Sequence, residues 1–577
     1  MATFSRAFLA ASLVAVAAAG AQERPESILP PGFGDPPPPS ATPTAPPATT
    51  ATGLPAIQPP PSPDASPSPS PTPTASPTPI DPETLARYEM PLFARRSLDD
   101  VGVAREVGPD AFGDADGGYI HALMRRTAAP PPSRWLHIAL RRALVSRLRP
   151  PRGVNGADFA AERAWLLLRM GESTAARAIV QGVDAANYTP KLHQVAMNAM
   201  LATGDPAGLC PLADAGLEAT GQAGWALAQP MCAALAGDGA RARTLFRAAR
   251  RRRLADGVDL RLAEKVVGAG GQGRQAVTIE WDAVDRLTVW RFGLATATGV
   301  AVPDALYETT GRQVTYWRAL APGVPLVDRI AAAEAAAAQG VLSSAALVDL
   351  YGAVDAEDDA SSAAAGAAQD LRVAYVGQDA GTRLTALRQL WGGGALDYGR
   401  LVLTARAAVR QPVSAENADR DRIVAAMLSV GMDRTAQRWS GAVPVGGDAW
   451  AMLALADPDA GRFGYGAVSG YETSPLKQRL FFAGLAGLGR LAREDVESGA
   501  ESLEIPIGAA NSWTRALDRA VAADQPGTVL MLAAVGMQTP SWRGVPPAAL
   551  YRIVAALRAV GLEGEARMIA VEAITRA

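Results

Sequence analysis

A short pattern recurs along this chain at intervals of 33 residues, from Gly171 to Gly204 and from Gly204 to Gly237. In the three copies, at residues 167–172, 200–205 and 234–238, a mostly apolar run ends in this glycine and an acidic residue follows it. Glycine readily adopts the left-handed conformation that ends many helices. The repeat therefore predicts successive pairs of helices, with the first helix of each pair closed by its glycine.

A glycine followed five residues later by an alanine is the wider form of this pattern. It occurs at Gly171/Ala176, Gly237/Ala242, Gly340/Ala345, Gly431/Ala436 and Gly561/Ala566, while Leu209 takes the place of the alanine after Gly204. The pattern resembles the tetratricopeptide family, whose period is 34 residues and in which the alanine packs where the two helices cross. The regular period covers roughly 110 residues, and the family's large aromatic positions are mostly absent. The resemblance implies an α-solenoid of antiparallel helix hairpins, either a true tetratricopeptide array or a degenerate solenoid.

Composition also favours an all-α fold. Hydrophobic residues make up 49% of the chain but aromatic residues only 6%, so alanine, the strongest helix former, supplies much of the apolar content. The net charge of −2 and the pI near 6.1 argue against a general nucleic-acid binder, which carries a basic excess. We expect no nucleic-acid partner.

The N-terminus has the pattern of a secretory signal peptide. Arg6 precedes a small and apolar run at residues 7–19, and Ala19-Gly20-Ala21 fits the small-x-small rule, which predicts cleavage between Ala21 and Gln22. The run is shorter than the about 20 residues that span a bilayer, so a retained anchor is the minor alternative. We expect an exported protein, periplasmic or secreted, without a stable transmembrane anchor.

A proline-rich tract follows the signal peptide. Residues 22–82 are rich in proline, serine and threonine, and proline removes backbone donors, so this tract is expected to be an extended or disordered tether. At about 3.1 Å per residue it reaches on the order of 180 Å. Its composition also resembles mucin-like stalks that carry O-glycans.

The rest of the chain divides by composition and periodicity. Asp81 followed by Pro82 predicts a helix start, and Ser133 predicts another helix that runs to Arg149. We expect an acidic segment at 83–132, tetratricopeptide-like repeats at 133–275 and a second helical-repeat region at 276–577. The boundary lies at 276–281, which reads as a short strand or as the start of the second region. Further helices are predicted at 329–339, 384–391, 401–410, 422–430, 478–491, 513–522, 548–560 and 563–575.

The chain has only two cysteines, Cys210 and Cys232. If 206–220 and 224–235 are antiparallel helices, the cysteines lie at nearly equal distances from the turn and face one another. An exported protein can keep such a bond, so we predict a disulfide. The alternative is two small buried thiols.

Several motifs suggest a cofactor or metal site, but their sequence context does not fit such a site. The glycines at 268–273 have the spacing of a dinucleotide loop, but a strand-like segment follows them where a helix is needed. An acidic stretch at 110–117 lacks the acids that an EF-hand requires. The histidines His121, His137 and His193 lack metal-ligand spacing. We therefore predict no catalytic residue, no cofactor and no metal.

One basic cluster stands out, and we interpret it as a patch for an anionic partner or as a helix end stabilised by the helix dipole. It consists of Arg247, Arg250, Arg251, Arg252 and Arg253. The leading hypothesis is a non-enzymatic scaffold that binds an envelope protein or cell-wall polymer. The alternatives are a peptidoglycan-active enzyme with a helical superhelix, with Glu280 or Glu504 as its acid, and an O-glycosylated surface protein.

Overall fold

The computed structural model describes residues 90–577 except 271–276, 358–362 and 395. The predicted signal peptide, the tether and the helix start at Asp81 lie outside these residues, as does Ala276 at the predicted boundary. The described residues belong to two compact units. Residues 90–95, with the 3-10 helix η1 (Leu92–Ala94), belong to one unit, and Arg96–Ala577 to the other.

The larger unit is all-α, as the composition predicts, and its described residues contain isolated β-bridges but no strand. The helices of its first part are η2 (Leu98–Asp100), α2 (Gly117–Arg126), α3 (Arg134–Val145), α4 (Gly156–Met170), α5 (Ser173–Gln181), η3 (Ala185–Asn187), α6 (Pro190–Ala202), η4 (Pro206–Leu212), α7 (Ala213–Thr220), α8 (Ala223–Leu235), α9 (Gly239–Arg251), α10 (Gly257–Gly270) and α11 (Val289–Ala297). None of the helices described in the chain is both long and apolar enough to cross a lipid bilayer.

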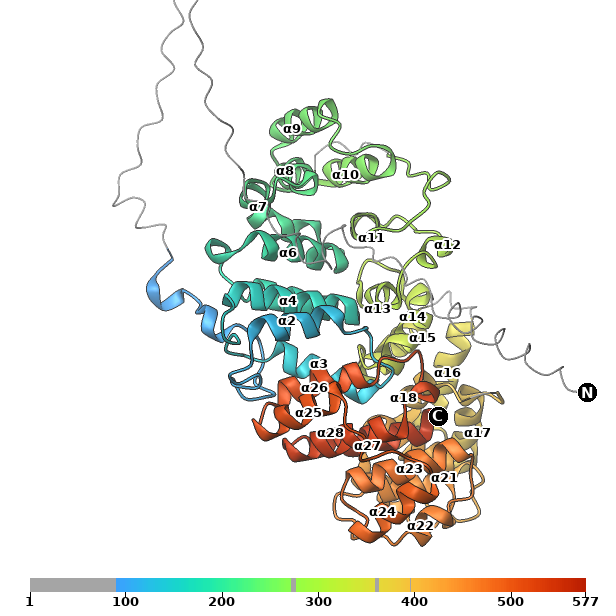
Figure 1. Cartoon of the computed structure of the whole chain (residues 1–577). Helices are drawn as coiled ribbons and strands as arrows, with labels where there is room; N and C mark the ends of the chain where they lie inside the picture. Colours follow the sequence, from blue (N-terminus) through green and yellow to red (C-terminus); the bar gives the residue numbers. More distant parts are fainter. Residues whose placement is uncertain (1–89, 271–276, 358–362, 395) are drawn as a thin grey trace, which may run out of the picture. The chain divides into compact units, whose positions relative to one another are not determined.

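The second part of the unit continues with further helices (Figure 1). They are α12 (Asp304–Tyr307), α13 (Arg312–Leu320), α14 (Leu326–Gln339), α15 (Ser344–Asp355), α16 (Ala363–Val376), α17 (Ala380–Trp391), α18 (Tyr398–Ala408), α19 (Arg420–Ser429), α20 (Asp433–Ala436), η5 (Gln437–Trp439), α21 (Asp448–Ala456), α22 (Gly466–Ser469), α23 (Pro475–Gly487), α24 (Arg493–Ser502), α25 (Ser512–Ala522), α26 (Pro526–Gly536), η6 (Trp542–Gly544), α27 (Pro547–Ala559) and α28 (Glu563–Arg576). The eight helices predicted downstream of residue 328 correspond to α14, α17, α18, α19, α23, α25, α27 and α28.

The left-handed glycine caps predicted from the repeat are confirmed. All six glycines have a positive φ, at Gly171, Gly204, Gly237, Gly340, Gly431 and Gly561. Five residues later, the side chain is buried at Ala176, Leu209, Ala242, Ala436 and Ala566, whereas Ala345 is partly exposed. The helices on either side of these turns pack together, as in α4 with α5, α8 with α9 and α27 with α28. Adjacent helix pairs are therefore the building unit of the fold.

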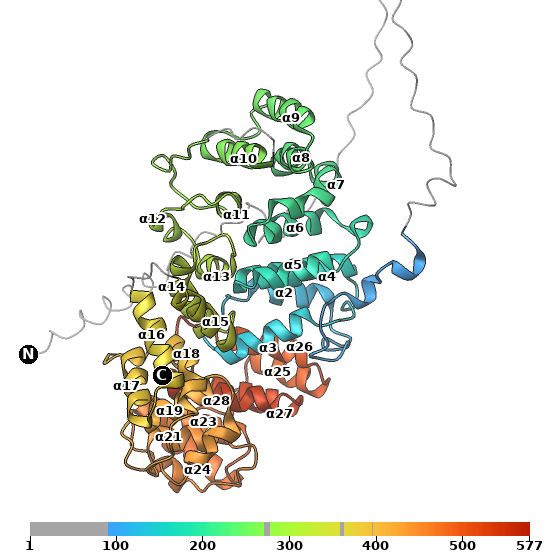
Figure 2. The ribbon, with the colours of Figure 1, turned by 180° about the vertical axis from the view of Figure 1, so that it is seen from behind.

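Helix α3 packs against helices from distant parts of the chain. It packs on α4 and α5, which follow it, and also on α14, α26 and α28 (Figure 2). The buried Arg134 guanidinium donates to the backbone carbonyls of Ala337 in α14 and Ser429 in α19. Arg141 donates to the carbonyls of Gly340 and Val341. These arginines thus donate to carbonyl groups at or just after the C-terminal ends of α14 and α19, where few intrahelical donors are available.

Three local predictions need correction. The helix that Ser133 caps ends at Val145, not at Arg149, because Ser146 and Leu148 leave the helix and form isolated bridges with Ala104 and Val101. The helix predicted over 206–220 is divided into η4 and α7, with Pro211 inside η4, where it cannot donate a backbone hydrogen bond. Residues 277–281 form no strand.

Candidate functional site

Helix α9 carries the basic cluster, and its amphipathic pattern determines which side chains reach solvent. Asp238 caps the helix by accepting a hydrogen bond from the Arg241 backbone N–H at 2.9 Å. Ala242, Phe246 and Ala249 are buried, and α9 packs on α8. These spacings of three and four residues place the apolar side chains on one face of the helix. The apolar face is therefore used in packing, and the opposite face is exposed.

The exposed face of α9 and the turn after it are almost purely cationic. Between Gly239 and Arg253 there is no acidic residue. Arg243, Arg247 and Arg250 are four and three residues apart, a spacing that lines side chains along one face of a helix. We name the exposed arginines of this segment the α9 arginine face: Arg241, Arg243, Arg247, Arg250, Arg251, Arg252 and Arg253. Five of these residues were predicted from the sequence as a cluster. Arg241 and Arg243 were missed, although the four-residue spacing between Arg243 and Arg247 could have found Arg243.

The α9 arginine face is not neutralised by carboxylates. Within the described part of the chain, none of its guanidinium groups forms an ion pair. Arginines elsewhere behave differently. Arg291 pairs with Asp259 at 2.8 Å, and Arg388 pairs with Asp419 at 2.6 Å. Arg250 and Arg251 also lie in the last turn of the helix, where the helix dipole stabilises only the nearest cations. The positive field of α9 is thus available to an external anion.

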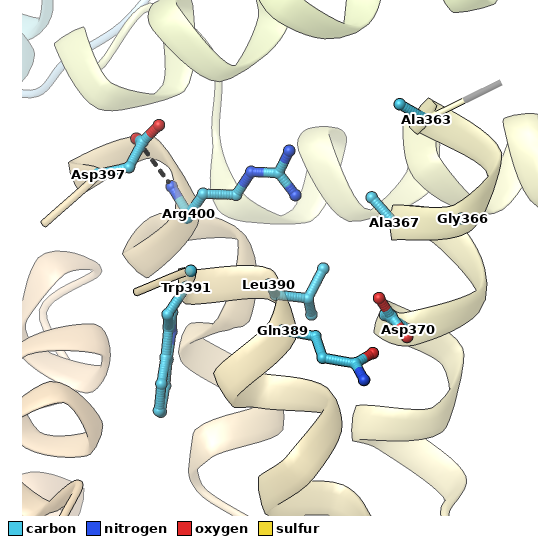
Figure 3. A pocket seen from close by; sticks show the side chains of 10 residues that line it. Ala363, Gly366, Ala367, Asp370, Gln389, Leu390, Trp391, Asp397 and Arg400 are labelled. Atoms are coloured by element: carbon cyan, nitrogen blue, oxygen red, sulfur yellow. Dashed lines mark hydrogen bonds between the residues drawn. The ribbon is translucent and has the colours of Figure 1, made fainter. Parts of the chain in front are cut away.

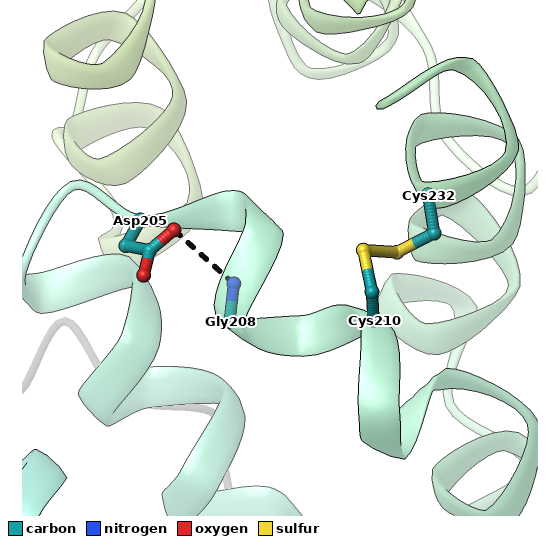
Figure 4. The surroundings of a disulfide bond; sticks show 4 residues. All are labelled: Asp205, Gly208, Cys210 and Cys232. Carbon is teal, nitrogen blue, oxygen red and sulfur yellow. Dashed lines mark hydrogen bonds between the residues drawn. A yellow bond between two sulfur atoms is a disulfide. The ribbon is translucent and has the colours of Figure 1, made fainter. Parts of the chain in front are cut away.

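A disulfide links η4 to α8, the helix on which α9 packs. The structure joins Cys210 in η4 to Cys232 in α8, with their Cα atoms 5.3 Å apart (Figure 4). Asp205 begins η4 by accepting a hydrogen bond from the Gly208 backbone N–H at 3.1 Å. Because α9 packs on α8, this covalent link holds the helix that supports the α9 arginine face.

A cavity of about 450 Å³ lies between α16, α17 and α18 (Figure 3). Its polar lining residues include Asp370, Gln389, Asp397 and Arg400. No sequence motif indicates this cavity, because its lining residues come from three helices and their flanking turns and are spread over residues 363–400. Behind Arg400, Glu334 lies 2.7 Å from the Arg400 Nε atom.

Glu334 is held by two groups. The Tyr351 hydroxyl donates to its Oε1 atom, and Arg400 pairs with the same oxygen. Burial raises the pKa of Glu334, although the Tyr351 hydrogen bond and the Arg400 charge both act to lower it. The pair positions the Arg400 side chain at the cavity wall.

A second charged cluster, around Glu162, is buried between α2, α4 and α6. Glu162 Oε1 accepts hydrogen bonds from Arg125 Nε at 2.7 Å and from Lys191 Nζ, and His121 Nδ1 lies 4.0 Å away. Burial acts to raise the pKa of Glu162, but the hydrogen bond from Arg125 and the charge of Lys191 outweigh it, so that the pKa is lowered. None of these residues lines the α16–α18 cavity, and the contacts indicate that the cluster joins three helices.

The remaining sequence motifs are dispersed. Residues 268–270 end helix α10, and 271–273 lie outside the described residues. In the acidic stretch, Asp110 pairs with Arg149, and Asp116 caps α2. Glu280 and Glu504 are both exposed, and neither lines the α16–α18 cavity.

The three histidines lie in helices. His121 is in α2 near Glu162, and His193 is in α6 with its ring edge against Trp225. His137 is fully buried in α3, with Nε2 at 2.9 Å from Glu172. The structure does not bring the three together into one site.

No protein-family model matches this chain, and no curated protein or solved structure matches it either. The assignment of a function therefore depends on the chemistry of the α9 arginine face and on the sequence patterns.

Proposed function

We propose that this protein is an exported α-solenoid scaffold that binds an anionic polymer of the cell envelope through the α9 arginine face. The observation that carries the proposal is the row of arginines on a helix face without ion-pair partners in the described residues. Guanidinium groups bind carboxylates and phosphates through paired hydrogen bonds, so both kinds of polyanion suit this face.

The solenoid part of the proposal is supported by the helix pairs. Their glycine caps recur with the predicted spacing, and most of the residues five positions later are buried. Stacked helix pairs provide extended binding surfaces. The tetratricopeptide resemblance belongs to the same proposal and implies binding of another macromolecule.

The buried apolar face of α9 favours a polymer over a membrane as the partner of the α9 arginine face. A helix that lies in a lipid interface buries its apolar side in the bilayer. In α9 that side packs within the protein, with Phe246 and Ala249 buried. The arginine face therefore acts by charge alone, and a flexible polyanion that follows the row of guanidinium groups is the partner that fits best.

The compartment is proposed from the sequence. The signal-peptide pattern and the proline-rich tether are consistent with an envelope protein. A disulfide between Cys210 and Cys232 suits an oxidising compartment.

Binding of the full-length protein to fluorescent polyphosphate and polyglutamate, measured by anisotropy, tests the proposal. We expect binding that weakens as salt is added, because salt screens exposed charges. The triple variant Arg243→Gln/Arg247→Gln/Arg250→Gln should lose at least about tenfold in affinity, which corresponds to ~1.4 kcal/mol.

The matched control removes three exposed arginines from other places, Arg406, Arg434 and Arg462, also by substitution with glutamine. This control has the same net charge as the test variant. It should bind within about twofold of the unaltered protein. Equal affinities of the two variants would overturn the proposal, as would tighter binding to anionic lipid vesicles than to both polymers.

A further inference from the structure

We propose that the cavity between α16, α17 and α18 binds a short peptide of two or three residues as a zwitterion, with its carboxylate on Arg400 and its ammonium group on Asp370. This site is separate from the α9 arginine face and does not depend on the function proposed for that face. The argument rests on how the two charged side chains are held and on the space between them.

Arg400 presents the free end of its guanidinium group to the cavity. Glu334 occupies the Nε side at 2.7 Å, and Glu334 is itself held by the Tyr351 hydroxyl. In the described part of the chain, no hydrogen bond or ion pair occupies the two Nη atoms of Arg400. Figure 3 shows the guanidinium group directed from α18 toward α16. Two parallel N–H donors in one plane match the two oxygens of a carboxylate.

Asp370 provides the opposite charge, from α16. The amide of Gln389 is oriented with its nitrogen toward Asp370. In this orientation the nitrogen donates to the two Asp370 carboxylate oxygens at 2.8 Å and 3.1 Å. A carboxylate has about four acceptor sites, so Asp370 retains capacity for an ammonium group. Asp397 is less available, because its Oδ1 atom caps α18 by accepting from the Gly399 and Arg400 backbone N–H groups.

The charge of the lining favours a zwitterion over a simple anion. The lining residues contain two carboxylates, Asp370 and Asp397, and one guanidinium group, Arg400. A ligand with only negative charge would be attracted by Arg400 but repelled by both aspartates. A peptide with free ends places one charge of each sign in the cavity, and each charge meets its opposite.

The shape of the cavity comes from small residues on α16. Ala363, Gly366 and Ala367 form one wall, and a Cβ atom built on Gly366 would meet no atom within 4 Å. The volume of about 450 Å³ falls in the range of small-molecule sites. Trp391 is fixed at the other side, since its indole N–H donates to Thr404 at 2.8 Å. The space is therefore preformed.

Isothermal titration of the full-length protein with alanyl-alanine tests this inference. We expect a Kd tighter than about 1 mM. N-acetyl-alanyl-alanine, which lacks the ammonium group, and alanyl-alaninamide, which lacks the carboxylate, should each bind at least about tenfold more weakly. Equal binding of the three compounds, or no binding of alanyl-alanine at about 10 mM, would overturn the proposal.

Substitutions of residues that line the cavity test whether the peptide binds there. Arg400→Lys keeps the charge next to Glu334 but loses the planar fork, and Asp370→Asn removes the partner of the ammonium group. Each should weaken alanyl-alanine binding at least about tenfold, and Gly366→Leu, on an exposed helix face, should abolish it by filling the cavity. The controls Arg406→Lys on α18 and Asp349→Asn on α15 alter exposed residues and should bind normally. Unchanged binding by Gly366→Leu would place the peptide elsewhere and refute the inference.

Discussion

Glu572 and Ser133 are 439 residues apart in the sequence, yet the Ser133 hydroxyl donates a hydrogen bond to the Glu572 carboxylate at 2.6 Å. The same carboxylate accepts from the backbone N–H of Arg134 at 2.9 Å. Glu572 in α28 thus satisfies a donor at the first turn of α3, where a negative charge is also favoured by the helix dipole. One buried side chain therefore joins α28 to α3.

Replacement of Glu572 should therefore destabilise the whole unit. Glu572 is fully buried, and Arg576 also donates to it at 2.6 Å. We expect Glu572→Ala to lower the free energy of unfolding by about 3–5 kcal/mol, because the half-buried Arg576 and the first turn of α3 lose their partner. Urea denaturation measures the change. The control Glu563→Gln, at an exposed position of the same helix, should cost less than about 1 kcal/mol. A similar cost for both variants would contradict this role.

The contact between Glu572 and α3 could not be predicted from the sequence, whereas some local features could. Local rules found the glycine caps, because a left-handed helix end has a glycine signature. They missed the hairpin turns at Arg253, Glu504 and Asp524, whose φ values are 52°, 52° and 49°, because these residues carry no such signature. The contact of Glu572 with α3 depends on distant packing, and no periodicity encodes it.

The two candidate sites also differ in how far the sequence predicts them. The α9 arginine face is contiguous in sequence, so most of it was predicted from the arginine run. The α16–α18 cavity depends on Arg400 being held by Glu334 in α14, which in turn accepts a hydrogen bond from Tyr351 in α15. Such an arrangement becomes visible only when the helices are packed.

Two of the glycine caps should differ in their tolerance of alanine. Both have positive φ, 83° at Gly237 and 102° at Gly340. A Cβ atom at Gly237 would meet no atom within 4 Å, whereas at Gly340 it would lie 2.9 Å from Ile138 Cγ1 and 3.0 Å from the Arg134 carbonyl oxygen. We expect Gly237→Ala to cost about 1–2 kcal/mol from backbone strain, and Gly340→Ala to cost a further ~1–3 kcal/mol from overpacking against α3. Urea denaturation of both variants checks the difference, and equal costs would show that α3 can move aside.

Loss of the disulfide should weaken the support of α9. The link closes a segment with a sequence separation of 22 residues, for which loop entropy predicts about 3 kcal/mol of stabilisation. We expect the double variant Cys210→Ser/Cys232→Ser to lose this amount and to show faster hydrogen exchange in α8 and α9. The stability of this variant should not change when reductant is added. The stability of the unaltered protein should fall to the level of the variant when its disulfide is reduced. Unchanged exchange in α8 and α9 would argue against a supporting role.

The lowered pKa values of the three histidines predict that the protein loses stability in weak acid. Burial lowers the pKa of His121, His137 and His193, so each takes up a proton more readily in the unfolded chain, where the pKa is about 6.5. Between the folded and unfolded pKa values the unfolded state binds more protons, and the free energy of unfolding therefore falls as the pH falls below about 6.5. Each histidine contributes at most ~1.4 kcal/mol per pH unit.

His193 offers the clearest test of this pH dependence, because burial lowers its pKa. Its ring packs against Trp225, and no carboxylate among the described residues pairs with it. We expect His193→Asn, which cannot be protonated in this range, to have a shallower loss of stability between about pH 7 and pH 5 than the unaltered protein. Urea denaturation at several pH values measures both slopes. Above about pH 8, where histidine is neutral in both states, the two proteins should keep a constant difference. Parallel curves through the whole range would mean that the pKa of His193 is the same in the folded and the unfolded protein, and the burial argument would then be wrong.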